Sequence, residues 1–78
     1  MSDTLMGLFS DVLGLRAEDL SDETSPDNTP EWTSVAAMHL VSTIEDTFDV
    51  SLDTREIMAM RTIGKARETL RAKGVDQI

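Results

Sequence analysis

Apolar residues recur with the spacing of an α-helix near the start of the chain. They fall at i, i+3, i+4, i+7 and i+8, so that one side of a helix would carry Leu5, Leu8, Phe9, Val12 and Leu13. Either Ser2 or Asp3 can cap the first turn, and Gly14 suits the C-terminal cap. The pattern predicts an amphipathic helix closed by Gly14, with Leu15 folded back over its end.

A second apolar stripe defines the helix around which the rest of the chain is arranged. Its members are spaced i, i+3, i+4, i+7 and i+11, and they are Ala37, Leu40, Val41, Ile44 and Phe48. The opposite, mostly polar side comprises Ala36, His39, Thr43 and Asp46. Pro30 pushes Thr29 toward an extended conformation, so the helix is not expected to begin before Glu31. Thr33 and Ser34 both suit its start, because a hydroxyl oxygen there accepts a hydrogen bond from a free backbone N–H group.

Two shorter elements follow. Val50 and Leu52 are expected to turn inward, and Asp53 with Glu56 forms a capping-box pattern that opens a short helix whose apolar members are Ile57 and Met60. Thr62 offers a cap for a last helix with an apolar stripe of Ile63, Ala66 and Leu70. Basic side chains that would complement its dipole are Arg67, Arg71 and Lys73, and Gly74 would end it.

The segment from Ala17 to Trp32 has no sustained period and is expected to be a long loop anchored by Leu20 and Trp32. Its carboxylates suggest calcium, but an EF-hand loop needs a central glycine that this segment lacks, so we predict no metal site. No strand pattern or internal repeat is present. The chain is therefore predicted to be all-α, a small four-helix bundle of three long helices and one short helix with a long first loop, in a single domain over residues 1–78.

Charge and composition narrow the possible partners. The 78 residues include fifteen acidic and seven basic side chains, for a formal net charge of −8, and no cysteine. Such a surface repels phosphate backbones and anionic lipids, which argues against nucleic acid and membranes as partners, and it attracts basic protein surfaces. Without cysteine, disulfides and thiolate chemistry are excluded. With no basic N-terminal flank and no apolar run of about 20 residues, we expect a cytoplasmic protein. At this net charge we also expect a monomer.

Ser34, at the start of the second predicted helix, has two interpretations. It can be a simple helix cap, which is the common role of a serine at such a position. Alternatively it can be an attachment point, because the free N–H groups and the positive dipole end of a helix would stabilise a phosphodiester anion there.

The order of elements, with a serine opening the second helix, resembles that of the acyl carrier proteins. From Thr33 to Ile63 the chain follows the family pattern without a gap, at Leu40, Val41, Ile44, Glu45-Asp46, Phe48-Asp49, Leu52 and Ile63. The stretch from Ser25-Pro26 to Pro30-Glu31-Trp32 is similar to the loop of discrete carrier proteins of secondary-metabolite pathways, in which a tryptophan precedes the Asp-Ser pair.

This resemblance implies a function. In the family the serine carries covalent 4′-phosphopantetheine, whose thiol holds acyl groups as thioesters, so Ser34 would be the cofactor-binding residue and the chain would have no catalytic residues of its own. Its partners would be a phosphopantetheinyl transferase and acyl-loading and acyl-processing enzymes with basic docking surfaces. The residues that these partners recognise would be Thr33, Val35, Ala36, His39, Glu45, Asp46 and Met58, with Met60 nearby.

The chain departs from the family pattern beside the serine. Thr33 stands where the family has an aspartate that helps to engage the transferase, Val35 replaces leucine or methionine, and Ala36 and His39 occupy positions that are often acidic. Ser51 lies in a Ser-Leu-Asp-Thr string that matches the motif better, but too few residues follow it for the remaining helices, and its expected role is that of a loop or capping hydroxyl.

Two other classes of function remain open at this stage. One is a carrier-like fold that is not modified and acts as a protein-interaction module, and the other is an unrelated acidic helical adaptor whose binding weakens strongly with salt. An enzyme is the least favoured class, because His39 is the only histidine and no nucleophile, base and orienting group stand together.

Overall fold

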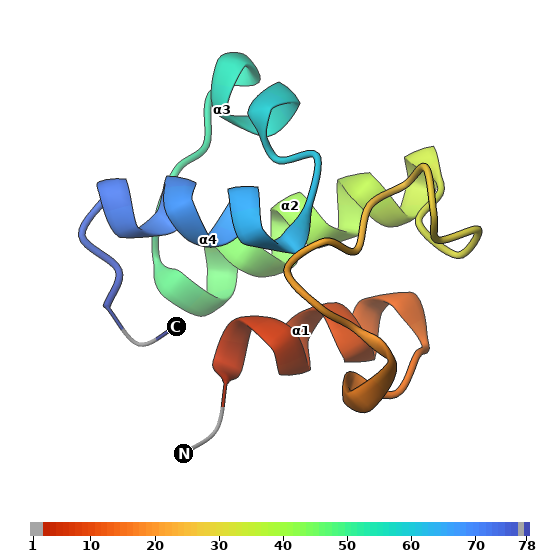
Figure 1. Cartoon of the computed structure of the whole chain (residues 1–78). Helices are drawn as coiled ribbons and strands as arrows, with labels where there is room; N and C mark the ends of the chain where they lie inside the picture. Colours follow the sequence, from red (N-terminus) through yellow and green to blue (C-terminus); the bar gives the residue numbers. More distant parts are fainter. Residues whose placement is uncertain (1–2, 77) are drawn as a thin grey trace.

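The computed structural model describes residues 3–76 and 78. These residues form four α-helices and one short 3₁₀ turn, with no strand: α1 (Thr4–Leu13), η1 (Ala17–Asp19), α2 (Ser34–Phe48), α3 (Thr54–Ala59) and α4 (Ile63–Ala72). Helix α1 packs against both α2 and α4, and the short α3 packs against α4 (Figure 1). The prediction of an all-α bundle with three longer helices, one short helix and a long first loop is confirmed.

The helices begin at the side chains that the sequence suggested. Asp3 caps α1 by accepting the N–H of Met6 at 3.0 Å, while Ser2, the alternative cap, lies outside the described residues. Thr62 caps α4 in the same way. At α3 the capping box is complete, since Asp53 accepts the N–H of Glu56 at 2.8 Å and Glu56 accepts that of Asp53 at 3.0 Å.

The C-terminal end of α1 also follows the prediction. Gly14 has φ +70°, the left-handed conformation that a glycine adopts without steric cost. The N–H groups of Gly14 and Leu15 both donate to the carbonyl of Ser10, at 3.0 and 3.1 Å, and Leu15 packs against the core. The chain therefore reverses immediately and leads into the long loop.

One core is formed by helices α1, α2 and α4 and by residues of the three connections between the helices. Its buried apolar members are Leu5, Leu8, Phe9, Leu13, Trp32, Leu40, Ile44, Leu52, Met60, Ile63, Ala66 and Leu70. Leu20 and Val50, predicted to turn inward, are partly buried against it. The prediction for Ala36 was wrong: it is partly buried on the core, because α1 covers that side of α2, where Thr43 lines a shallow groove together with Gly7 and Asp11.

The long loop is held against the start of α4. The carbonyl oxygens of Asp22 and Thr24 accept the N–H groups of Gly64 and Ile63, at 2.9 and 3.1 Å. These are two of the N–H groups that the first turn of a helix cannot satisfy internally, so the loop serves as part of the cap of α4. The loop crosses from the end of α1 past α4 to the start of α2 (Figure 1).

Arg67 has a different role from the predicted one. It does not complement the α4 dipole from the helix end; its side chain is only 11% exposed, and its guanidinium donates to Asp3 at 2.9 and 3.2 Å and to Asp22 at 3.1 Å. Arg71 does lie in the last turn of α4, and Lys73, the C-cap residue, pairs with Glu56 at 2.9 Å. Arg67 thus joins α4 to the cap of α1 and to the long loop.

Loss of the charge on Asp3 should weaken the fold in a pH-dependent way. The hydrogen bond from Arg67 lowers the pKa of the Asp3 carboxyl; partial burial opposes this, and the Met6 N–H acts in the same direction as Arg67. A lowered folded-state pKa adds stability that is present above about pH 4 and is lost as the pH falls through that pKa.

Asp3→Asn keeps a capping oxygen but removes the charge. We expect it to lower the free energy of unfolding at pH 7 by about 1 kcal/mol, a small value because the Asp3 side chain is 39% exposed and partly screened. Urea unfolding followed by circular dichroism at pH 7 and pH 3 should show the difference shrinking at the lower pH. An equal difference at both values would mean that the charge is not responsible.

Gly64 should be required by the close approach of the loop. A Cβ atom there would lie 3.1 Å from both the Cβ and the carbonyl oxygen of Asp22, whereas at Gly7, inside α1, it would meet nothing within 4 Å. We expect Gly7→Ala to raise the free energy of unfolding by about 0.5–1 kcal/mol, and Gly64→Ala to lower it. Thermal unfolding of the two variants side by side tests this, and an equal gain in both would show that the loop is free to move away.

Candidate functional site

Ser34 is the first residue of α2, and its side chain is exposed. Thr33 before it is the cap: its Oγ1 accepts the N–H of Ala36 at 3.2 Å, and its carbonyl accepts that of Ala37 at 2.8 Å. The N–H groups of Ser34 and Val35 come before these bonds, where a helix supplies no acceptor. The first turn contains no acidic side chain. The hydroxyl of Ser34 therefore lies at the positive end of the helix, which favours an anion.

The loop fixes where this helix begins. The N–H of Trp32 donates to the carbonyl of Thr29 at 3.0 Å, and the Trp32 indole packs on the ring of Phe9 in α1, with ring centroids 5.2 Å apart and planes tilted by 59°. Trp32 is only 7% exposed. Two residues before Ser34 the chain is thus anchored to the core, and the serine itself is left at the surface.

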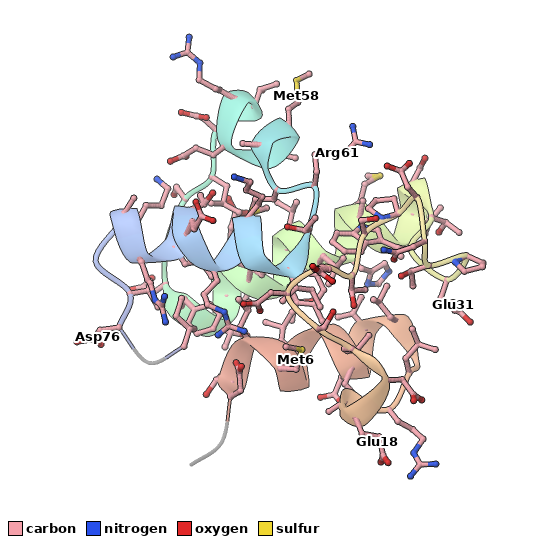
Figure 2. The ribbon with its side chains drawn as sticks, in the orientation of Figure 1. Met6, Glu18, Glu31, Met58, Arg61 and Asp76 are labelled. Atoms are coloured by element: carbon pink, nitrogen blue, oxygen red, sulfur yellow. The ribbon has the colours of Figure 1, made fainter. Side chains whose placement is uncertain are left out.

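Exposed apolar side chains surround the serine's helix face. Val35 and Met38 on α2 are 67% and 72% exposed, and Met58 on α3 is 70% exposed and projects away from the bundle (Figure 2). An open apolar groove of about 300 Å³ runs beside them, lined by Ala37, Met38, Val41, Ser42 and Ile57. The groove lies between α2 and α3, so side chains of both helices are presented together.

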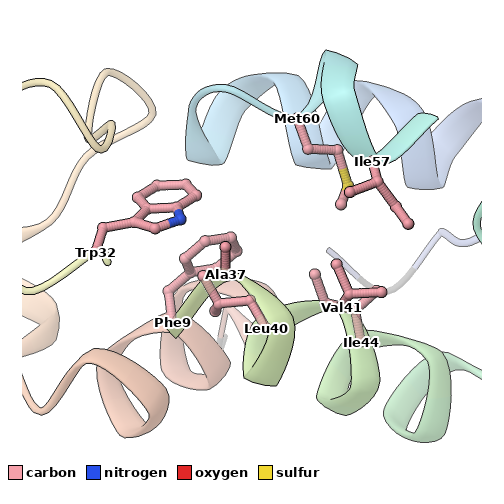
Figure 3. A pocket seen from close by; sticks show the side chains of 8 residues that line it. All are labelled: Phe9, Trp32, Ala37, Leu40, Val41, Ile44, Ile57 and Met60. Carbon is pink, nitrogen blue, oxygen red and sulfur yellow. The ribbon is translucent and has the colours of Figure 1, made fainter. Parts of the chain in front are cut away.

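Beneath the groove lies a much smaller cavity of about 40 Å³ in the core. Its walls are apolar and come from α1, the end of the long loop, α2 and the α3 region: Phe9, Trp32, Ala37, Leu40, Val41, Ile44, Ile57 and Met60 (Figure 3). Three residues, Ala37, Val41 and Ile57, line both spaces, so the cavity adjoins the groove.

The other predicted recognition residues differ in their exposure and in the side of α2 on which they lie. Val35, His39 and Asp46 are exposed and share one side of α2, since they are spaced i, i+4 and i+11. Ala36 lies on a different side, toward α1. Glu45 is half-buried, and its Oε2 accepts the N–H of Leu52 at 2.8 Å, which ties the connection after α2 to that helix.

Sequence reasoning did not include Met38 among the recognition residues, although it is among the most exposed apolar side chains next to the serine. The signal was present in the spacing, because residues i and i+4 share a helix face and Met38 lies four residues after Ser34. Met60, expected in the short helix, instead follows α3 as its C-cap residue and is buried in the core. Met58 is exposed on α3 whereas Met60 is buried, so of these two methionines only Met58 is available to a partner.

Ser51, the other candidate serine, is exposed in the connection between α2 and α3. It precedes the α3 cap, Asp53, by two residues and is not the first residue of any helix. The N-terminus of α3 is also capped by its capping box, and its first turn contains an acidic side chain, Glu56. Ser51 therefore lacks the helix-start environment that Ser34 has.

Across residues 3–76 and 78 there is no group of three or more histidine, aspartate or glutamate side chains placed to hold a metal ion. Within the same part of the chain, none of the helices has the length and apolar character that a bilayer crossing requires.

The comparisons with known proteins agree with this geometry. Residues 3–70 match a family model described as phosphopantetheine attachment site. The chain is also similar to the solution NMR structure of a holo acyl carrier protein from Nitrosomonas europaea, with a TM-score of 0.76 and 28% sequence identity over 90% of each chain. No curated protein matches the chain.

The family model covers most of the chain, which excludes the unrelated acidic adaptor considered above. Proteins of this kind are carriers and not enzymes, and their cofactor is covalently bound 4′-phosphopantetheine. From its helical order, its exposed serine at a helix start and these two matches, we conclude that the chain belongs to the phosphopantetheine attachment site family and is an acyl carrier protein.

Proposed function

We propose that Ser34 is the residue that bears 4′-phosphopantetheine. The observation that supports this most directly is its exposed hydroxyl at the start of α2, beside backbone N–H groups that have no acceptor within the helix. Ser51 offers a hydroxyl without that environment.

The residues around Ser34 fit the cofactor. A phosphodiester on its Oγ would carry a negative charge, and the helix start supplies N–H donors and no opposing carboxylate within the first turn. The arm that extends from the phosphate would lie beside the open groove of Ala37, Met38, Val41, Ser42 and Ile57, which offers it an apolar surface. The cofactor supplies the thiol on which acyl groups are held as thioesters.

The chain itself would then serve to hold the attached cofactor in place. Thr33 holds the first turn in place, Ser34 provides the attachment oxygen, and Trp32 fixes both relative to the core. A tethered acyl group is presented to each partner enzyme at a high effective concentration, which replaces a substrate-binding pocket on the carrier. The phosphopantetheinyl transferase would move the phosphopantetheinyl group from coenzyme A onto the Ser34 hydroxyl.

We further propose that partners dock on the side of α2 that carries Val35, His39 and Asp46, together with Met58 on α3. Val35 and Met58 would supply apolar contact, supported by their exposure. The net charge of −8 would steer enzymes with basic docking surfaces toward the protein, and charge of this kind affects the rate of encounter more than the final affinity. The tryptophan-containing loop supports acyl-loading and acyl-processing enzymes of a secondary-metabolite type as these partners.

Modification should depend on Ser34 alone. After incubation with coenzyme A, magnesium and a broad-specificity phosphopantetheinyl transferase, intact mass spectrometry should show one added phosphopantetheinyl group on the native chain and on Ser51→Ala, and none on Ser34→Ala. Addition to Ser34→Ala but not to Ser51→Ala would reverse the assignment of the site. If no chain were modified by any transferase tried, the unmodified interaction module would become the better description.

Thr33 should limit the rate of modification without affecting the fold. Thr33→Asp keeps a capping oxygen and adds the charge that the family has at this position, and we expect about a tenfold faster modification, equivalent to one charge-assisted contact of roughly 1.4 kcal/mol. Thr33→Asn is the matched control, since asparagine caps equally well without a charge. Initial rates by mass spectrometry distinguish the variants. Equal acceleration by Asn and Asp would show that helix capping, and not charge, limits the reaction.

A further inference from the structure

The core cavity beneath the groove is too small to hold an extended acyl chain. An engineered apolar cavity of about 150 Å³ holds one benzene molecule, whereas the space lined by Phe9, Trp32 and Met60 measures about 40 Å³. We propose that Trp32 closes this space, so that the protein carries short acyl groups of up to about four carbons outside its core. This inference rests on the attachment function proposed above and specifies its cargo.

Trp32 is held firmly in the position that fills the core. Its indole is almost fully buried against Phe9, and its backbone N–H is bonded to Thr29. The preceding loop is stiffened by Asn28, whose Oδ1 accepts from the N–H of Ser25 and the hydroxyl of Thr29, at 2.9 and 2.7 Å. Its amide nitrogen donates to the carbonyl of Glu23 at 3.0 Å. Moving the indole aside would break the aromatic contact and disturb this loop.

The geometry places Trp32 where an entering chain would end. In Figure 3 the indole and Phe9 lie at one end of the cavity and Val41 and Ile57 at the other. Val41 and Ile57 also line the outer groove, so an acyl group enters past them and would meet the indole within the length of the cavity. Displacement of Trp32 would lengthen the path into the core from this end.

Short acyl groups gain too little from burial to displace an indole, because the gain grows with each buried methylene. Such groups would stay in the groove between α2 and α3, in contact with Met38 and Ser42 and open to water. The groove also accepts polar substituents on the cargo, since nothing there has to be desolvated completely.

The test compares acetyl, butyryl and octanoyl forms of the full chain, each prepared enzymatically and verified by intact mass. In the native protein we expect the melting temperature to change by no more than about 2 °C from acetyl to butyryl, with the emission of Trp32 unchanged, and to rise little further in the octanoyl form, whose gain from burial only about matches the cost of displacing the indole. A melting temperature that rises steadily with chain length, with a change in Trp32 emission, would overturn the proposal without the need for any variant.

Trp32→Leu should open the cavity while keeping an apolar side chain. In this variant the octanoyl form should melt at least about 5 °C above the acetyl form. Leu13→Ala is the matched control, because Leu13 is a buried core residue that does not line the cavity, so its removal weakens the fold without creating this space. If Trp32→Leu showed no dependence on chain length, or if Leu13→Ala showed the same one, Trp32 would not be the residue that closes the core.

The closed cavity can also be tested without modification. If intact mass showed no phosphopantetheine on the chain, the proposed attachment function would fail, but benzene added to the unmodified protein would still probe the space. It should raise the melting temperature of Trp32→Leu and not that of the native chain. Stabilisation of the native chain by benzene would show that the core is already open.

Discussion

Arg67 joins three parts of the chain that are far apart in sequence, and the position of the long loop depends on it. Its guanidinium donates to Asp3, whose Oδ1 also caps α1, and to Asp22 in the loop. Buried ion pairs contribute little net stability once the cost of desolvation is counted. This ion pair instead fixes the position of the long loop. If the loop moved away, Arg67 would be left buried and unpaired at a high cost, and without Arg67 the carboxylates of Asp3 and Asp22 would repel each other. The loop is therefore held at the start of α4, and its far end reaches Phe9 through Trp32.

The distribution of charge complements this arrangement. A chain with a net charge of −8 would repel an anion over most of its surface, yet the only acidic residues of α2 are Glu45 and Asp46, near its far end. Glu45 is further engaged with the N–H of Leu52. The start of the helix therefore keeps its positive dipole end, while the rest of the surface keeps its negative charge. The anionic attachment proposed at Ser34 is compatible with an acidic chain because the carboxylates of α2 lie near the far end of that helix.

Features set by neighbouring residues could be predicted from the sequence, and features set by distant contacts could not. The caps at Asp3, Thr33 and Thr62 and the turn at Gly14 depend on residues within one helical turn, so the local pattern is sufficient. Arg67 looked like a helix-end cation because its partners are 45 and 64 residues away. The resemblance to carrier proteins indicated Ser34, and the predicted helix start implied free N–H groups beside it, but the groove depends on how α2 and α3 meet.

The closed core follows from a comparison of two free energies. Each methylene moved from water into an apolar interior gains about 0.8 kcal/mol, whereas removal of a buried tryptophan side chain costs about 3–5 kcal/mol. An acyl chain would need about four to six buried methylenes to offset the displacement of Trp32, before the loss of its contact with Phe9 is counted. Acetyl and butyryl groups fall short of this number. Trp32 therefore sets a threshold in acyl chain length. Short acyl groups leave the indole in place, and for longer ones the free energy gained by burial approaches the cost of displacing the indole.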